Sequence, residues 1–431
     1  MKVKIYPGIA NGEISAPSSK SLLHRLLICA SLANEKCELH NTMVNDDVLA
    51  TISCLNKLGA EIVVLDNKIL IKKGIVFKKN YEEVVINANE SASTLRFLIP
   101  LSSYLSKRVV FVGKKSLLKR PNDIYRYLYE KESKKFKILE DKIVIEGELN
   151  ENEYLIDGTV SSQFISGLLF YLPLRKTDSK IIINGFLQSK PYVLLTIMVL
   201  KEFGVNIDYT DEVIMIKGNQ TYKCKRSVFN VEGDYSQAAN FLCLGALNGN
   251  VMVRNLDEKS LQGDKKIIDF LKQMGANIVK KDDGYLTGKG NTLINCTFDL
   301  IDNPDLVPIL LVCLSTITNK SVIKNVKRLK YKESDRIFSM KEELDKFGIY
   351  FEYLVEKDEI VIQGKSELIV EEDIELSSHN DHRIFMALSI LATLIKGSGK
   401  IIINNSECLN KSYPKFLSDL KSLGIKVEKV N

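Results

Sequence analysis

Apolar and polar positions along the chain repeat in one pattern, an amphipathic helix that ends in Leu-x-x-apolar-Gly and is followed by two short apolar strands around a polar turn. The helix ends read LNKLG from residue 55, LKEFG from 200, LKQMG from 271, LDKFG from 344 and LKSLG from 420. Each glycine stands where a helix C-cap favours it, and each pair of apolar runs predicts a hairpin. The pattern therefore predicts a repeated helix-hairpin unit.

The closing strands of these hairpins set the period of the repeat. They end at Gly74, Gly147, Gly218, Gly290 and Gly364, at intervals of 71 to 74 residues. The helix near residue 420 is followed by only one strand, and residues 2–8, KVKIYPG, match a closing strand. We therefore expect six units of about 70 residues, the last of them completed by the N-terminal strand.

Three such units make a plausible domain, so two domains are expected. The first spans residues 15–230, and the second combines 1–14 with 231–431. Because the chain then crosses twice between the domains, we expect a hinge, with the active site in the cleft between them.

Composition changes this picture little. The chain is 45% hydrophobic and 26% charged, with a net charge of +6 spread among alternating signs, which does not favour nucleic-acid binding. We find no apolar stretch of 18 residues and no signal-peptide core. The eight scattered cysteines are expected to be reduced thiols. These features predict a cytoplasmic protein that binds neither nucleic acid nor membrane, and we expect a monomer.

Cations recur where helices are predicted to begin, although the helix dipole disfavours them there. The positions are Lys20, Arg120, Lys332 with Arg336, His382 with Arg383, and Lys411. Solvated lysines explain any one of these positions, but five similar ones favour a shared task. Helix N-termini and cations together bind anions, so the sequence predicts a site for phosphates and carboxylates.

Neutral and acidic side chains complete the candidate chemistry. Hydroxyl and amide groups occur at Ser161, Ser162 and Gln163, and again at Ser189 and Tyr192; the acids Asp305 and Glu333 stand beside the cations. An ordinary helix cap explains each of them singly. In a cationic site, however, the two acids are candidates for proton transfer.

Several motifs are missing from the sequence. VFVGKKS at 110–116 lacks the upstream glycine of a phosphate-binding GxxxxGK[ST] loop, and neither GxGxxG nor HExxH is found. We therefore expect neither a cofactor nor a metal, and the chemistry left is a reaction between anions.

An ordered set of motifs resembles the 5-enolpyruvylshikimate-3-phosphate synthase family, the 3-phosphoshikimate 1-carboxyvinyltransferases. The motifs are PSSKSLLHR, STLRFLIP, LKRP, DGTVSSQF, SKPY, EGDYSQAA, LQGD, NPD, KESDR, NDHR and KSYP, in order between residues 17 and 414. Most are weak singly, but the ordered set is specific.

This resemblance implies an α/β fold of the inside-out type, with two domains of three βαβαββ units each. It also implies the reaction: the enolpyruvyl group of phosphoenolpyruvate passes to the 5-hydroxyl of shikimate 3-phosphate by addition and elimination through a tetrahedral intermediate, and phosphate is released. That reaction belongs to the shikimate pathway, which leads to chorismate and the aromatic amino acids.

The resemblance further implies roles for single residues. Asp305 is the expected base for the 5-hydroxyl and Glu333 the expected proton donor, while Lys20 contacts both substrates. The positions expected to bind shikimate 3-phosphate are Ser21, Arg25, Ser161, Ser162, Gln163, Ser189, Tyr192, Asp305 and Lys332. Those expected to bind phosphoenolpyruvate are Ala92, Arg120, Gln163, Arg336, Arg383 and Lys411.

The chain departs from the family pattern at three positions. Many members have glycine at Ala92 and asparagine at Glu90, and asparagine also replaces Arg328 in some. The extra methyl of Ala92 predicts reduced sensitivity to glyphosate, a bulkier analogue of phosphoenolpyruvate. We leave Arg328 out of the site.

Two other functions stay open at this stage. One is the enolpyruvyl transfer to UDP-N-acetylglucosamine, whose family usually carries a cysteine in the loop GKKSLLKRP; here no cysteine lies between Cys54 and Cys224. The other is a non-catalytic module that binds phosphorylated ligands.

Overall fold

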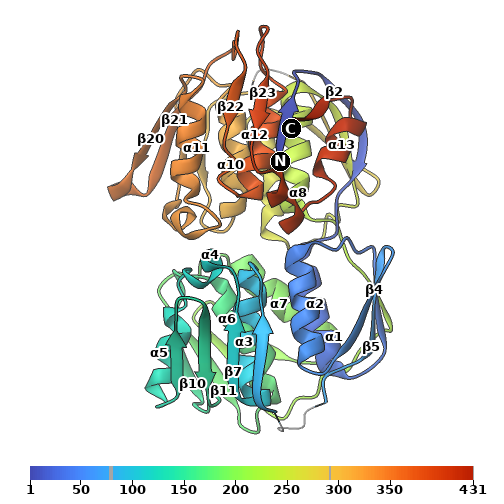
Figure 1. The fold of residues 1–431 in the computed structure, drawn as a ribbon, viewed down its shortest axis with the longest axis vertical. Coiled ribbons are helices and arrows are strands. Elements are labelled where there is room, and N and C mark those ends of the chain that lie inside the picture. The colour runs from blue at the N-terminus through green and yellow to red at the C-terminus, as the bar shows by residue number, and fades with distance from the viewer. Residues whose placement is uncertain (77–80, 291–292, 431) are drawn as a thin grey trace. The chain divides into compact units, whose positions relative to one another are not determined.

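The computed structural model describes residues 1–76, 81–290 and 293–430 and consists of two compact units. One unit is continuous and spans Ser18–Val231. The other combines Met1–Pro17 with Glu232–Asn431. They are called the inserted unit and the terminal unit below (Figure 1).

The described residues form six four-stranded sheets, three in each unit. Each sheet begins with a parallel pair of strands, continues with an antiparallel strand and ends with the hairpin partner of that strand. This common topology confirms the six repeats that the hydrophobic pattern predicts, and with them the α/β class.

The strands of the inserted unit are as follows. One sheet contains β14 (Val228–Asn230), β3 (Cys37–His40), β5 (Lys68–Lys73) and β4 (Glu61–Leu65). The next contains β6 (Tyr81–Asn87), β7 (Ser106–Val112), β9 (Lys142–Glu146) and β8 (Lys135–Ile138). The third contains β10 (Glu153–Asp157), β11 (Ser179–Asn184), β13 (Val213–Ile216) and β12 (Ile207–Tyr209).

The terminal unit repeats this order. One sheet contains β2 (Ala10–Ser15), β15 (Gly249–Arg254), β17 (Gly284–Gly288) and β16 (Asn277–Lys281). The next contains β18 (Thr297–Asp299), β19 (Ser321–Lys324), β21 (Glu359–Gln363) and β20 (Tyr350–Leu354). The third contains β22 (Ile374–Leu376), β23 (Ile401–Ile403), β1 (Lys2–Ile5) and β24 (Val427–Val430).

The N-terminal strand belongs to the last of these sheets. β1 pairs antiparallel with β24, so that Val3 lies opposite Lys429, and on its other side with β23, where Val3 lies opposite Ile403. The closing strand of the last repeat is thus supplied by the start of the chain, and both chain ends lie in one sheet (Figure 1).

Two helices accompany each repeat. In the inserted unit they are α1 (Lys20–Ala33) and α2 (Asp46–Lys57), α3 (Ala92–Leu105) and α5 (Asp123–Lys131), and α6 (Ser162–Tyr171) and α7 (Lys190–Glu202). In the terminal unit they are α8 (Tyr235–Asn248) and α9 (Ile267–Gln273), α10 (Val307–Leu314) and α11 (Arg336–Asp345), and α12 (His382–Ala392) and α13 (Phe416–Ser422).

Short helices connect these elements. They are α4 (Lys115–Leu118), η1 (Leu172–Leu174), η2 (Gly263–Lys266), η3 (Pro304–Leu306), η4 (Lys327–Tyr331), η5 (Val355–Lys357) and η6 (Ser406–Lys411). Several carry motif residues, including Asp305 in η3 and Lys411 in η6.

The first helix of each repeat lies in the core. In the terminal unit α8, α10 and α12 contact one another, and every residue of α10 is buried. A helix that is apolar on all sides needs cover on all sides, and for α10 the neighbouring helices α12 and α8 provide most of it, together with β21. These first helices therefore lie inside, while the sheets and the second helices, such as α5 and α13, lie outside (Figure 1).

The glycines that follow the second helices have the conformation expected from the sequence. Gly59, Gly204, Gly275, Gly348 and Gly424 all have positive φ, between 63° and 104°. A side chain at these positions would be strained, so these glycines end the helices and start the hairpins.

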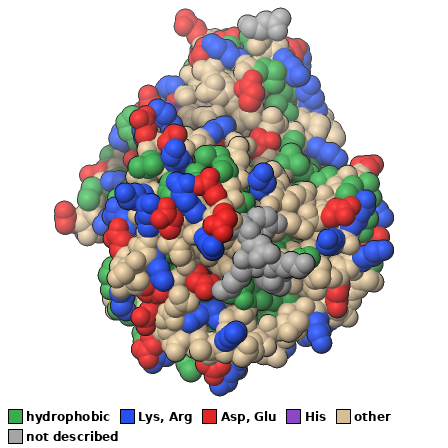
Figure 2. Space-filling model, turned by 60° about the horizontal axis from the view of Figure 1, so that its bottom comes forward, with side chains coloured by type: hydrophobic (Ala, Val, Ile, Leu, Met, Phe, Trp, Pro, Cys, Tyr) green, Lys and Arg blue, Asp and Glu red, His purple; other side chains and the backbone are tan. Residues whose placement is uncertain are grey.

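Figure 2 shows lysine and arginine side chains intermixed with aspartate and glutamate over the face that it displays. Among the described helices, none has the length and hydropathy needed to cross a membrane. All eight cysteines are free thiols, and only Cys224 among them is partly exposed.

Candidate active site

The terminal unit gathers its candidate residues around one buried guanidinium. Arg336, only 1% exposed, is the first residue of α11. It donates to Asp305 at 2.7 Å, to Glu333 at 2.8 Å and to Asp381 at 2.7 Å. The two acids that the sequence singles out therefore share one cation.

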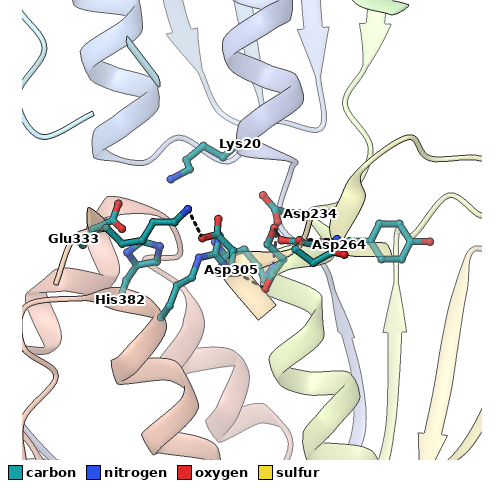
Figure 3. Close-up of polar contacts among 12 residues, drawn as sticks. Lys20, Asp234, Asp264, Asp305, Glu333 and His382 are labelled. Atoms are coloured by element: carbon teal, nitrogen blue, oxygen red, sulfur yellow. Dashed lines mark hydrogen bonds and ion pairs between the residues drawn. The ribbon is translucent and has the colours of Figure 1, made fainter. Parts of the chain in front are cut away.

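Asp305 is partly exposed and lies among three cations. Besides Arg336, Lys332 Nζ lies 3.2 Å from Oδ1 and Arg383 Nη2 lies 3.2 Å from Oδ2 (Figure 3). Burial by itself would raise the pKa of this carboxyl, but Arg383, Lys332 and Arg336 together hold the pKa well below its usual range. Asp305 is thus an ionised carboxylate, and it is a weak base as long as these three cations pair with it.

Lys332 and Glu333 directly follow η4 in the chain. Burial lowers the pKa of Lys332 to about 8, with Arg336 and Arg328 adding to the shift and Asp305 opposing it. Glu333 is nearly buried, and besides its bond to Arg336 it lies 3.8 Å from Lys411 Nζ. Lys411 itself is 6% exposed, so Lys411 and Glu333 form a largely buried pair of opposite charges.

In the inserted unit, Lys20 is the first residue of α1, after the N-cap Ser19. Its Nζ lies 2.7 Å from Asp47 Oδ2, and the Asp47 side chain is only 7% exposed. The carboxylate offsets the cost of a cation at a helix N-terminus.

Arg25, one turn further along α1, connects that helix to α7. It donates to Thr196 Oγ1 at 2.8 Å, to the Tyr192 carbonyl at 2.9 Å and to the Ser21 carbonyl at 2.6 Å. Its guanidinium stacks over Phe97 at 5.0 Å. Burial lowers its pKa to about 10, so the guanidinium stays charged at neutral pH.

The neutral residues occupy the starts of α6 and α7. Ser161 is the N-cap of α6 and accepts from the Gln163 amide, and Ser162 is buried. Ser189 is the residue before α7 and has a left-handed backbone with φ of 56°. A non-glycine residue in that conformation is uncommon and marks a constrained position.

Gln163 is oriented by a residue that the sequence analysis did not place in the site. Arg96 donates from Nη1 to Gln163 Oε1 at 2.9 Å and from Nη2 to the Pro121 carbonyl at 2.8 Å. Gln163 in turn donates to Ser93 at 3.0 Å. Arg96 thus positions both Gln163 and the loop of Arg120, and its place in STLRFLIP was the only signal.

Ala92 and Glu90 flank the start of α3. Ala92 is its first residue and is 8% exposed. Glu90 accepts from Lys114 at 3.1 Å and from Ser116 at 2.7 Å, so it ties down the loop after β7.

Three of the cation positions differ from the sequence expectation. Lys20, Arg336 and the pair His382 and Arg383 do begin helices. Lys411, however, ends η6, Lys332 follows η4, and Arg120 lies between α4 and the N-cap Asn122 of α5. None of these three residues stands in the first turn of a helix, so the dipole argument does not apply to them.

Asp381, which the sequence indicates only as part of the motif NDHR, lies in the candidate site. It is fully buried, caps α12 through the Arg383 amide and binds Arg336. One carboxylate therefore joins the starts of α11 and α12. His24, left unassigned from the sequence, contacts Thr51 at 2.7 Å, and burial lowers its pKa to about 3; it is a neutral core residue.

One group within the described ranges has the ligand types for a metal ion, namely Glu342, Glu343 and His379. Glu343 also accepts from Lys346 at 2.7 Å and from the Ser377 amide at 3.0 Å. Lys346 and the Ser377 amide already satisfy the Glu343 carboxylate. We therefore interpret the three residues as a structural contact between α11 and the segment before α12.

A sequence model of the family described as EPSP synthase (3-phosphoshikimate 1-carboxyvinyltransferase) matches residues 7–420 of the chain. The chain belongs to the EPSP synthase family. The match extends over most of both units and includes every candidate residue, and it confirms the resemblance drawn from the ordered motifs.

Relatives and a solved structure agree with this membership. A 3-phosphoshikimate 1-carboxyvinyltransferase of Clostridioides difficile is 39% identical and that of Clostridium acetobutylicum 43%, with at least 97% of each chain covered. The structure of EPSP synthase from Acinetobacter baumannii matches with a TM-score of 0.79 over 99% of this chain and 100% of that one, at 22% identity. The last likeness supports the fold alone.

Proposed function

We propose that this chain catalyses the reaction of its family, the transfer of the enolpyruvyl group of phosphoenolpyruvate to the 5-hydroxyl of shikimate 3-phosphate with release of phosphate. The observation that carries the proposal is the contact of Arg336 with both Asp305 and Glu333. That contact places a candidate base and a candidate acid beside the same cation, as an addition-elimination needs.

In the proposed mechanism, Glu333 protonates the methylene carbon of phosphoenolpyruvate and Asp305 removes the proton of the 5-hydroxyl. The oxygen adds to the resulting cationic carbon to give the tetrahedral intermediate. Phosphate then leaves while the methyl group returns a proton to the Glu333 carboxylate, which restores the carbon–carbon double bond of the enolpyruvyl group. Arg336, Arg383 and Lys411 would hold phosphoenolpyruvate, together with Arg120, Gln163 and Ala92. Shikimate 3-phosphate would lie on Ser21, Arg25, Ser161, Ser162, Gln163, Ser189, Tyr192 and Lys332, and Lys20 would touch both.

The ion pairs of the structure suggest how the base becomes active. Arg336 and Arg383 now hold the pKa of Asp305 low. A substrate carboxylate or phosphate that draws these guanidinium groups toward itself would weaken that hold, because each cation then shares its charge with a second anion. Phosphoenolpyruvate binding would thus raise the proton affinity of Asp305 when a base is needed.

The proposed reaction uses residues of both units. We therefore propose that the active site lies in the interdomain cleft. We also propose a cytoplasmic monomer, and the eight free thiols fit a reducing compartment.

The test is to incubate the protein with shikimate 3-phosphate and phosphoenolpyruvate, without added metal, and to measure released phosphate. Release that depends on both substrates is expected. Release only with UDP-N-acetylglucosamine as the acceptor would assign the sister reaction, and release with neither acceptor would leave the binding module.

The affinity for shikimate 3-phosphate is expected to weaken as the pH rises through about 8, the pKa of Lys332. Below that pH the ammonium can donate a charged hydrogen bond to the anion; above it, the neutral amine contributes less. Losing such a bond costs about 1.5–3 kcal/mol, so Kd should rise by about tenfold to hundredfold. Isothermal titration calorimetry at evenly spaced pH values between about 6.5 and about 9.5 measures this dependence of Kd on pH.

The Lys332→Arg variant should lose this pH dependence, because a guanidinium stays protonated throughout. Lys327→Arg, at an exposed position of η4, is the matched control and should keep it. The same pH dependence in Lys332→Arg as in the wild type would contradict the assignment.

Ala92→Gly is expected to increase glyphosate sensitivity. The Ala92 methyl is nearly buried at the start of α3, and overpacking by one methyl group costs about 1–3 kcal/mol. The half-inhibitory concentration should therefore fall by about tenfold or more, with a small change in the KM for phosphoenolpyruvate. Inhibition curves of phosphate release that coincide for the two forms would refute this.

A further inference from the structure

A buried carboxyl group lies behind the Asp305 cluster and has no role in the mechanism above. Asp264, in η2, is fully buried. Its Oδ2 accepts a short hydrogen bond from Ser236 Oγ, and its Oδ1 accepts from Asn303 Nδ2 at 3.4 Å. Figure 3 shows Asp264 beside Asp234 in the region of Asp305.

Each partner of Asp264 leads to a proposed site residue. Asn303 begins the turn that carries Asp305: its carbonyl accepts from the Leu306 amide at 3.1 Å. Ser236 lies in the first turn of α8, and its carbonyl accepts from Arg383 Nη1 at 3.4 Å. Arg383 in turn lies 3.2 Å from Asp305. Asp264 is thus joined to both members of that ion pair through one intermediate residue each.

Charged groups surround Asp264, so a change in its protonation alters the electrostatic field at Asp305 and Arg383. The charged groups that face it are Asp305 from η3, Arg383 from α12 and Asp234 from the N-cap of α8. Burial, and then Asp305, raise the pKa of Asp264 to about 6, while Arg383 and the Ser236 hydroxyl oppose the shift. Asp264 therefore changes charge just below neutral pH.

An ionised Asp264 makes Asp305 a stronger base. Its negative charge competes with Asp305 for Arg383 and repels the charge of Asp305 directly, and both effects raise the proton affinity of Asp305. Protonation of Asp264 removes both effects and leaves Arg383 to Asp305 alone. A more acidic Asp305 is a weaker base.

We propose that Asp264 is a positioning residue that holds Asp305 and Arg383 through Asn303 and Ser236, and that its negative charge keeps Asp305 basic enough to take the 5-hydroxyl proton. The inference rests on the proposed function, because it takes Asp305 as the base. Asp264 would not touch the substrate.

The test compares the pH dependence of kcat for the wild type and Asp264→Asn, measured as phosphate release with both substrates saturating. In the wild type, kcat should rise with pH at or above about 6, the pKa of Asp264 without ligands, because kcat reports the substrate complex and the bound anions raise that pKa. In Asp264→Asn this rise should be absent. At about pH 8 its kcat should be about tenfold to hundredfold lower, less than the full contribution of a general base, because Asp305 stays in place as a weaker base. The two profiles should converge at low pH, where Asp264 is uncharged in the wild type as well.

The substrates' phosphate groups also titrate near pH 6, but they do so equally in both enzymes, so the difference between the profiles isolates Asp264. Both KM values should change by less than about threefold, since charge positioning and not binding is lost. Asp269→Asn, an exposed aspartate in the adjacent helix α9, is the matched control and should behave as the wild type.

Ser236→Ala gives a second, independent prediction, which decides the matter should Asp264→Asn fail to fold. Removing a hydroxyl that donates to the carboxylate raises the pKa of Asp264 further. The rise in kcat should therefore move to higher pH instead of disappearing.

If the wild type released no phosphate at any pH, the proposed function and this inference would both be overturned. An active wild type with an unchanged profile in Asp264→Asn, or with an unmoved rise in Ser236→Ala, would overturn the inference alone. A lowered kcat that keeps the wild-type pH dependence in Asp264→Asn would also overturn the role of the charge.

Discussion

Replacing Glu333 with glutamine is expected to lower kcat by about 10²–10⁴-fold, the usual contribution of a general acid. The amide keeps the size of the side chain and can still accept from Arg336, which now binds Glu333 at 2.8 Å. It has no acidic proton to give to the methylene carbon. Substrate affinities should therefore change little while turnover collapses.

Two measurements check this expectation. Phosphate release gives kcat and KM, and deuterium incorporation into the methylene group of phosphoenolpyruvate, followed by NMR in heavy water, reports the protonation step itself. Glu333→Gln should lose both signals, whereas Glu356→Gln, at an exposed position in η5, should lose neither. Turnover within about threefold of the wild type would exclude Glu333 as the acid, because a general acid contributes far more.

Replacing Lys20 with alanine is expected to lower kcat/KM by about 10²–10⁴-fold. The proposal gives Lys20 one charged contact with each substrate, and each such contact contributes about 1.5–3 kcal/mol. Lys68→Ala, which removes a partly exposed ion pair with Glu38, is the control and should leave kcat/KM unchanged.

Stability must be separated from activity in this variant. A cation at a helix start contributes little stability by itself, but the structure pairs Lys20 with the nearly buried Asp47. Breaking such a pair from one side is destabilising. Lys20→Ala should therefore melt at a lower temperature, and adding Asp47→Asn should restore much of the Tm without restoring activity. Recovery of turnover in the double variant would show that Lys20 acts only through folding.

The sequence was most informative where local chemistry repeats. Helix C-cap glycines and paired apolar strands follow from backbone sterics and side-chain periodicity, which act over a few residues. They predicted the hairpins and the six repeats that the sheets display. The ordered motifs likewise indicated the EPSP synthase family, to which the family match assigns the chain.

Local signals were weaker at helix starts, because a cation before a helix and a cation after a short 3-10 turn look alike in sequence. Lys332 and Lys411 follow or end such turns, and only the three-dimensional path of the chain separates them from Lys20 and Arg336. What these residues share is a carboxylate partner within reach, which the helix-dipole argument did not supply.

By itself, then, the sequence determined the repeat, the class of fold, the family and the residue types of an anion-binding site. Only the tertiary structure decided which charges meet: that Arg336 joins Asp305, Glu333 and Asp381, that Arg96 orients Gln163, and that Asp264 stands behind Asp305. The physical reason is that these partners, apart from Glu333 three residues before Arg336, come from different repeats or distant turns. Their interaction energies depend on distance and burial, which no local pattern in the chain encodes.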